Sequence, residues 1–455
     1  AHGRSGVKKM VSQTVSEFVA GSRWEDLPDD VRHATKRSLL NFFGTALEGT
    51  HDSAVERALA TLREFAGSGE ATLIGRVERA DALTAAFINA AAGNVHDFDD
   101  THLRTVIHPT APVAPALLAL AEHRPMNGRE FIHALALGME FTCRIGNAVS
   151  PDHYARGWHI TATCGVFGAA LAVGKVLGLN AQQLTWAMGN ASAQASGLVE
   201  TLGFMTKSVG VGGSARGGLL AGLLAEKDYD GPPKPLEGVR GFLHVTGEDP
   251  QYGDVIDDLG TRWETLKNIH KPYPCGIVIN AVIDGCLELQ QRLTVPVEEI
   301  ASITLSGHSL LEQRADRANV MTGRESQVSA QHAVAVSLIF GAAGLAQFTD
   351  EAVHDPRVSA FRQKVKLAVI PDTPVPDVRL DVVYADGRTE EIQVKDARGT
   401  DNRPLTDQEI EEKFRTLAAT YAPDCGEAEK LIEAVWSLEN ADEVSQMMAY
   451  AVPAS

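Results

Sequence analysis

Acidic and histidine side chains are concentrated in one short segment of this chain. Residues 96–108 hold three aspartates and three histidines, and alanine-rich stretches flank them at 90–92 and 111–114. Titratable groups packed against apolar walls have shifted pKa values, and enzymes use such groups to transfer protons. The segment therefore predicts an acid–base site that moves a proton to or from a small substrate.

Three interpretations of this segment stay open. Its side chains could bind a metal, although their spacing matches no common motif; they could form a buried structural network; or they could orient a substrate and move a proton. In the third case Asp97 and Asp100, three residues apart, would share one face if the segment is helical. Thr101 could hydrogen-bond a substrate carboxylate. His108 precedes Pro109, so we expect it in a loop, where catalytic groups often lie.

His159 is a second candidate. It opens an apolar helical stretch that has no charged residue before Lys175. A histidine in such a stretch is either a core residue with its hydrogen bonds satisfied or a functional group. Because it follows Gly157 at a helix N-terminus, it could meet an anion with the help of the free backbone amides there.

Lys207 is the only charged residue between Glu200 and Arg216. It is either exposed or paired with an anion, and a substrate carboxylate is a good partner. The glycines of 203–218 fit neither the GxxxxGK[ST] motif nor a GxGxxG that follows a strand. We therefore expect close helix packing there and no nucleotide site.

Two further candidates come from the second half of the chain. Lys271 stands in the proline-stiffened turn 271–275, at an expected junction between domains, and clefts between domains favour ligand sites. It is either a preorganised anion contact or an exposed residue of a linker. His332, in a helix of the second domain, could reach the same cleft.

The net charge of −18 (41 basic against 59 acidic residues) argues against nucleic acid or an anionic membrane as a partner. It also means that an anionic substrate needs locally collected positive charge.

The five cysteines lack any CxxC pair, which indicates reduced thiols and a cytoplasmic location. No apolar run approaches the ~18 residues of a membrane span. Residues 1–9 are expected to be a disordered lead-in before Met10.

The pattern of apolar residues predicts a mainly α fold in two domains. A large all-α domain is expected from 10–268 together with 401–455, and a smaller α+β domain from 269–400 is inserted between them. Helical spacing dominates 11–225 and recurs at 276–292 and 329–345. Alternation predicts strands at 300–306 and on both sides of a turn at Asp386-Gly387. Thr406 with Glu409 resembles a capping box, so the chain after it should return to the large domain as helices.

Four segments in this order resemble the MmgE/PrpD family over nearly the whole chain: HDFDDTH…HP at 96–109, GWHITATCGVFGAA at 157–170, FMTKSVGVGGSARGG at 204–218 and KPYPCG at 271–276. The family contains 2-methylcitrate dehydratases, cis-aconitate decarboxylases and an iminodisuccinate epimerase, which act next to a carboxylate of a small di- or tricarboxylate. The resemblance implies the two-domain fold above, a homodimer, and no iron–sulfur cluster, other cofactor or metal. The residues that resemble the decarboxylase site are Asp97, Thr101, His108, His159, Lys207 and Lys271.

Two departures from the decarboxylases indicate a possible change of substrate. The segment between Thr101 and His108 is one residue longer than in the animal enzymes, and His332 stands where those enzymes offer a tyrosine.

Our mechanistic hypothesis is that Lys207, Lys271 and His159 hold substrate carboxylates and stabilise a carbanionic intermediate. His108, kept in place by Asp97 and Asp100, would be the general acid or base. Dehydration of the 2-methylcitrate type is the first expectation, with decarboxylation or epimerisation as the alternative. Outside enzymology, the scaffold could serve a carboxylate- or metal-binding protein, or the polar group could be purely structural.

Overall fold

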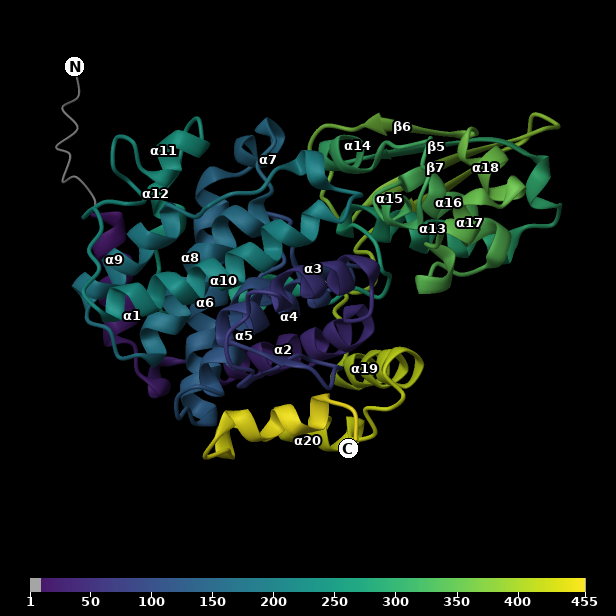
Figure 1. Cartoon of the computed structure of the whole chain (residues 1–455). Helices are drawn as coiled ribbons and strands as arrows, with labels where there is room; N and C mark the ends of the chain where they lie inside the picture. Colours follow the sequence, from purple (N-terminus) through teal and green to yellow (C-terminus); the bar gives the residue numbers. More distant parts are fainter. Residues whose placement is uncertain (1–9, 455) are drawn as a thin grey trace, which may run out of the picture.

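The computed structural model describes residues 10–454, which are mainly α-helical. Figure 1 shows a large helical body and, beside it, a smaller part built around a sheet. The mainly α fold class is thus confirmed. The domain boundaries at 268/269 and 400/401 stay a prediction, and residues 1–9, expected to be a lead-in, lie outside the described residues.

The helical body is formed by the N-terminal part of the chain. Its helices are α1 (Val11–Gly21), α2 (Asp29–Gly49), α3 (Ser53–Arg63), α4 (Ala82–Asn94), α5 (Thr110–Ala121), α6 (Gly128–Val149), α7 (Asp152–Arg156), α8 (Ile160–Val176), α9 (Ala181–Ser192), α10 (Thr206–Glu226), α11 (Phe242–Thr246) and α12 (Tyr252–Ile256). Every residue of α5 is buried, as is α8 from Ile160 to Gly174, because both lack a polar face. Side chains cap the surrounding helices: Asp81 begins α4, and Asn127 with Glu130 forms a capping box on α6.

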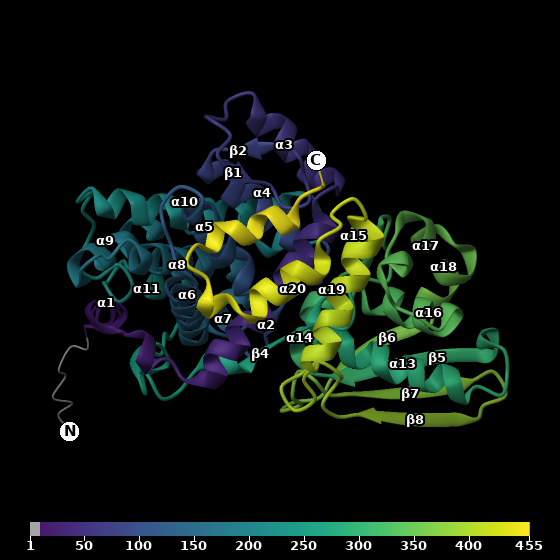
Figure 2. The ribbon, with the colours of Figure 1, turned by 90° about the horizontal axis from the view of Figure 1, so that it is seen from below.

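The smaller part has a four-stranded sheet in the order β6-β5-β7-β8. The strands are β5 (Ile300–Gly307), β6 (Val365–Val369), β7 (Val378–Tyr384) and β8 (Thr389–Val394), and the helices are α13 (Asn280–Arg292), α14 (Ser309–Ala315), α15 (Gly323–Ser326), α16 (Ala330–Phe340), α17 (Asp350–His354) and α18 (Pro356–Arg362). Figure 2 shows α13 and α16 over one face of this sheet. The hairpin expected around Asp386-Gly387 is confirmed as β7–β8, with Gly387 at φ 87°.

The C-terminal helices α19 (Asp407–Tyr421) and α20 (Ala428–Trp436) return to the helical body and pack on α2 (Figure 2). Thr406 and Glu409 form the expected capping box at the start of α19. The helix expected over 329–345 ends sooner, at Phe340, because Gly341 adopts a left-handed conformation with φ 65°.

The expected all-α character of the large domain needs one correction. The described part of the body also contains two short antiparallel pairs, β1 (Ala71–Thr72) with β2 (Arg79–Ala80) and β3 (Thr101–His102) with β4 (Asn268–Ile269). Strands of two residues carry too little alternation to be seen in a sequence. The second pair matters for function, because it joins the acid–histidine segment (residues 96–108) to the segment that precedes Lys271.

All five cysteines are buried and unpaired. Among residues 10–454, no helix combines the length and the apolar character that a membrane crossing requires.

The glycines of α10 allow this helix to pack closely against α8. A Cβ atom on Gly218 would lie 2.3 Å from the Cβ of Ala169 and 2.9 Å from the backbone nitrogen of Ala170. By contrast, a Cβ atom on Gly213, in the same helix, would meet nothing within 4 Å. The packing interpretation of this glycine-rich segment is therefore confirmed for Gly218.

We expect opposite effects from one substitution at these two positions. Gly218→Ala should lower the free energy of unfolding by about 1–3 kcal/mol, because α8 and α10 must move apart. Gly213→Ala should leave it unchanged or raise it by up to about 1 kcal/mol, because alanine favours helix over glycine. Urea unfolding followed by circular dichroism measures both, and equal stability of the two variants would contradict the packing described here.

Candidate active site

The acid–histidine segment leaves the helical conformation just before its first aspartate. Helix α4 ends at Asn94, and Asp97 has a left-handed φ of 53°, which aspartate tolerates better than most residues. The β3–β4 pair then aligns Thr101 with Ile269. The chain that follows β4 therefore runs beside Asp97 and brings Lys271 to it.

A single carboxylate, that of Asp97, gathers the basic groups of the site. The Lys271 ammonium is fully buried and donates to the backbone oxygen of Asp97 at 2.9 Å and to its Oδ1 at 2.8 Å. Nε2 of His108 lies 3.2 Å from the same Oδ1, and Nζ of Lys207 lies 3.9 Å from it. Burial would raise the pKa of Asp97, but Lys207, Lys271 and His108 outweigh it and hold this pKa well below its usual range.

His108 is surrounded by acceptors on both sides of its ring. Nδ1 donates to the backbone oxygen of Asp100 at 2.9 Å and lies 3.2 Å from Oγ1 of Thr101 and 3.3 Å from Oδ1 of Asp99. Nε2 faces Asp97. Each ring nitrogen therefore faces at least one oxygen that can accept a proton, and a histidine placed in this way can serve as a general acid or base.

Lys207 comes from the first turn of α10 and is buried. Its Nζ also donates to the backbone oxygen of Asn94 at 3.3 Å. Burial lowers the pKa of Lys207, and the carboxylates of Asp97 and Asp99 oppose this. The expectation that this lysine is paired with an anion is therefore met inside the protein by Asp97, at a distance that leaves room for a second anion.

His159 is the N-cap residue of α8, as its sequence context indicates. Its ring is buried, and no hydrogen bond to it is found among residues 10–454. Burial, then the nearby Lys207 and His108, holds the pKa of His159 well below its usual range. The ring is thus neutral, and its contribution to anion binding would be a hydrogen bond rather than a charge.

The expectation that Asp97 and Asp100 share a helix face is wrong, because residues 95–100 form turns and bends. The carboxylate of Asp100 points into the core, where it accepts hydrogen bonds from Thr110 and, at 2.6 Å, from Asn268. Burial and then Asp99 raise the pKa of Asp100 to about 6. Its backbone oxygen, not its carboxylate, orients His108, so the structure does not present Asp100 to a substrate.

His332 also departs from the expectation that it reaches the cleft. Its Nε2 donates to the backbone oxygen of Gln347 at 2.7 Å, and its ring packs on Phe348. Burial lowers the pKa of His332 to about 4, against the effect of that hydrogen bond. Among the described residues, no contact joins His332 to the Asp97 group (Asp97, His108, Lys207 and Lys271). His332 lies in the core of the smaller part.

Several side chains at the site carry no clear signal in the sequence. Arg314 and Tyr154 meet at the junction of the two parts, with the guanidinium carbon 5.3 Å from the centre of the tyrosine ring. Lys413, from α19, donates to the backbone oxygens of Phe98 at 2.8 Å and Lys271 at 2.9 Å. Burial and then Lys271 lower the pKa of Lys413 to about 7. Only the tertiary fold brings these residues to the site.

The metal interpretation meets an electrostatic difficulty. Ligand atoms of Asp97, Asp99 and His108 lie within 4.8 Å of one another, so the donor set could hold an ion. However, Oδ1 of Asp97 already has Lys271 at 2.8 Å and Lys207 at 3.9 Å. A cation would have to displace or neutralise these ammonium groups, whereas an anion would be attracted by them.

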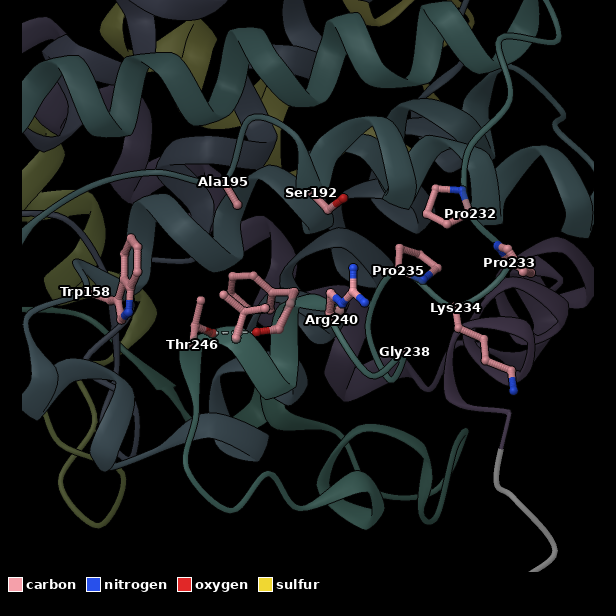
Figure 3. Close-up of a pocket in the computed structure, with 13 residues that line it drawn as sticks. Trp158, Ser192, Ala195, Pro232, Pro233, Lys234, Pro235, Gly238, Arg240 and Thr246 are labelled. Carbon is pink, nitrogen blue, oxygen red and sulfur yellow. Dashed lines mark hydrogen bonds between the residues drawn. The ribbon is translucent and has the colours of Figure 1, made fainter.

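Two surface cavities lie at different distances from this chemistry. One of about 480 Å³ is lined largely by apolar side chains, with Trp158 at one end and prolines 232, 233 and 235 at the other (Figure 3), and includes none of the Asp97 group. Another, of about 490 Å³, is lined by His96, Asp52 and Arg324 and opens between the two parts of the molecule. His96 lines the second cavity and is next to Asp97 in the chain, so we expect the entrance to the site at this cavity, although Asp97 itself is buried.

Ion pairs cross this entrance. His96 lies between the carboxylates of Glu48 and Asp52, with Nε2 2.9 Å from Asp52, and Arg324 of α15 binds Asp52 at 2.9 Å. Burial would lower the pKa of His96, but Glu48 and Asp52 outweigh it and raise this pKa to about 9. The imidazolium form therefore stabilises the helical body, while the Arg324–Asp52 pair joins this body to the smaller part.

Comparison with known proteins gives matches over most of the described chain. The MmgE/PrpD N-terminal domain matches residues 13–254, and the MmgE/PrpD C-terminal domain matches residues 273–439. The chain is 29% identical to a cis-aconitate decarboxylase-like protein, oryM, of Aspergillus oryzae, with 96% of each chain covered. It is 27% identical to a cis-aconitate decarboxylase of Aspergillus terreus (98% of this chain, 96% of the relative) and 25% identical to that of Homo sapiens (96% and 93%).

The charge of His96 predicts a pH dependence of stability. The folded pKa of His96, about 9, lies above its unfolded value, so its stabilisation is complete below about pH 6.5 and disappears as the pH rises through 9. The loss should be at most about 3 kcal/mol. Between pH 6.5 and 9.5, the melting temperature of the parent should fall more than that of His96→Gln. The exposed His123→Gln variant should follow the parent, and parallel curves for all three proteins would refute this role of His96.

Removal of the central carboxylate should destabilise the protein strongly. Asp97→Asn leaves the buried ammonium of Lys271 without its counter-charge, which should cost about 3–5 kcal/mol in chemical unfolding. Asp386→Asn, in the exposed turn of the β7–β8 hairpin, should change the free energy of unfolding by less than about 0.5 kcal/mol. If the two variants unfold alike, Lys271 is not charged in the way these contacts imply.

Proposed function

The chain belongs to the MmgE/PrpD family, and from that premise we propose that it is a lyase that decarboxylates cis-aconitate or a closely related tricarboxylate. One observation carries the proposal: Lys207, Lys271 and His108 converge on the buried Asp97 in a protein whose net charge is −18. Positive charge concentrated against the overall charge of the molecule suits a small polyanion. The printed names of the relatives favour decarboxylation.

The reaction needs one bond to break and one proton to be delivered. In cis-aconitate the bond between the methylene carbon and its carboxylate carbon breaks, and carbon dioxide leaves. The electron pair of that bond forms a new double bond to the central carbon. The former π pair moves to the outer alkene carbon, which is α to its own carboxylate and takes up one proton. The product is methylenesuccinate.

The side chains of the site suit these steps. His108 is the proton donor, because its ring is held between Asp97 and Asp100 with both nitrogens facing acceptors. Negative charge develops on the carbon α to a carboxylate, and the cation of Lys207 with the neutral N–H of His159 stabilises it from preset positions. Thr101 contacts the His108 ring and orients it.

Lys271 has a different role from the one the sequence indicates. Its ammonium is already bonded to two oxygens of Asp97, so we assign it to positioning Asp97 rather than to binding a substrate carboxylate directly. It also adds to the positive potential that an entering anion meets.

Dehydration of the 2-methylcitrate type, the first expectation from the sequence, and epimerisation share the same proton transfer next to a carboxylate. They differ from decarboxylation in the leaving group and in the face that receives the proton. Decarboxylation is the leading proposal because the similar proteins carry that name. A homodimer and a cytoplasmic location stay predictions, and light scattering of the purified protein tests the first.

Proton NMR in heavy water, with a chelator present, tests the proposed reaction. The purified protein is incubated separately with cis-aconitate, 2-methylcitrate, citrate and iminodisuccinate. We expect methylenesuccinate from cis-aconitate, with one deuterium on its saturated carbon. A new olefin from 2-methylcitrate alone would instead establish dehydration, and loss of activity with the chelator would restore the metal interpretation.

Replacement of the proposed proton donor should affect turnover far more than binding. His108→Gln should lower kcat about 10²–10⁴-fold, because a positioned acid contributes that much, while KM stays within a few-fold. His354→Gln, on the exposed end of α17, is the matched control and should keep full activity. Near-normal kcat in His108→Gln would remove His108 from the mechanism.

A further inference from the structure

Arg314 is the one arginine that is buried without a full set of partners among the described residues. It lies in α14 of the smaller part with only 4% of its surface exposed, and its Nε and Nη1 atoms have no hydrogen-bond partner among residues 10–454. A buried guanidinium left unsatisfied is costly, so its position needs an explanation.

The other buried arginines show what a structural role looks like. Arg144 binds the Glu140 carboxylate and several backbone carbonyls, Arg76 binds Glu56 and Thr50, and Arg362 donates to the carbonyls of Ala318 and Val353. Each of these guanidinium groups is used to hold protein segments together. Arg314 lacks such acceptors for its Nε and Nη1, and its guanidinium instead packs near the ring of Tyr154.

Arg314 lies near the basic groups of the proposed active site. It packs on Tyr154 of α7, and the chain runs from α7 directly to His159, the N-cap of α8. Consistent with this, the charge of Arg314 adds to the effects that lower the pKa values of His159 and Lys207. The nearby carboxylates have other partners, since Asp97 holds Lys271 and His108, and Asp99 accepts from Asn94 at 2.9 Å. No ion pair joins Arg314 to a carboxylate among residues 10–454, and its Nε and Nη1 have no partner there, so this guanidinium is left for an external carboxylate.

Arg314 stands on one side of the proposed ligand and His159 with Lys207 on the other, and the two sides belong to different parts of the fold. Arg314 is carried by α14 of the smaller part, whereas His159 and Lys207 begin α8 and α10 of the helical body. Figure 1 shows α14 at the end of the smaller part nearest α7, which carries Tyr154. A ligand with two separated carboxylates could contact both sides at once.

We propose that Arg314 binds one carboxylate of the substrate through its planar guanidinium while Lys207 and His159 bind another, so that the substrate itself bridges the two parts of the molecule. This inference rests on the proposed function only in taking the substrate to be a small polycarboxylate. It makes Arg314 a specificity residue, because an acid with a single carboxylate satisfies one side and leaves the other unpaired.

Binding of an inert ligand tests this inference without any turnover. Propane-1,2,3-tricarboxylate has no double bond and no hydroxyl, so it can undergo neither the proposed decarboxylation nor a dehydration. Calorimetry should give a Kd about 10- to 100-fold higher for Arg314→Met than for the parent, because a charge-assisted pair is lost. Arg314→Lys should recover only part of this affinity, since an ammonium cannot form the paired, planar contact.

Arg317→Met is the matched control, because Arg317 lies three residues further on, just after α14 ends, and donates to the backbone oxygen of Leu202. Its Kd should stay within about twofold of the parent. The melting temperature of Arg314→Met should equal or exceed that of the parent, which a structural role for Arg314 would not allow.

An unchanged Kd in Arg314→Met, an equal loss in Arg317→Met, or no binding of the tricarboxylate by the parent would each overturn the inference. Butyrate, with a single carboxylate, should bind the parent and Arg314→Met equally weakly, and tight binding of butyrate would also contradict it. If tricarboxylate binding depends on Arg314 but the NMR experiment shows no carbon dioxide loss, the proposed reaction fails while the assignment of Arg314 stands.

Discussion

The contact between the Asp97 carboxylate and the fully buried Lys271 ammonium is the interaction on which the site depends. An ammonium at zero exposure is tolerated only next to a counter-charge, so Lys271 needs Asp97 at 2.8 Å. The same oxygen then fixes Nε2 of His108 and limits how far Lys207 can move. One ionised side chain thus determines the positions of three basic groups, and it stays ionised because those groups surround it.

The sequence could identify the acid–histidine segment, His159 and Lys207, because each is a polar group in an apolar neighbourhood. The β7–β8 hairpin and the cap of α19 could also be predicted from the sequence, since turn and capping residues act locally. The left-handed conformation of Asp97 and the inward orientation of Asp100 could not be predicted, because they depend on the two-residue β3–β4 pair. Arg314 resembles an ordinary surface arginine of a short helix until the fold buries it.

The geometry also separates groups that bind from groups that support. Lys271, Thr101 and the backbone of Asp100 are engaged with Asp97 or His108, so they hold the proton donor in place. The ring of His159 has no hydrogen bond among the described residues, while Lys207 and Arg314 have donors to spare. Sequence patterns assign such residues to a site together, whereas only the contacts show which of them is left for a ligand.

The late position of Lys413 in the sequence affects when the site can be completed during protein synthesis. Its ammonium links the backbone oxygens of Phe98 and Lys271, so α19 completes a site whose other parts lie far earlier in the chain. Protein synthesis proceeds from the N-terminus, and domains begin to fold while it continues. The helical body can therefore begin to form on the ribosome before α19 emerges, but the nascent chain acquires its finished site only after α19 has left the ribosome.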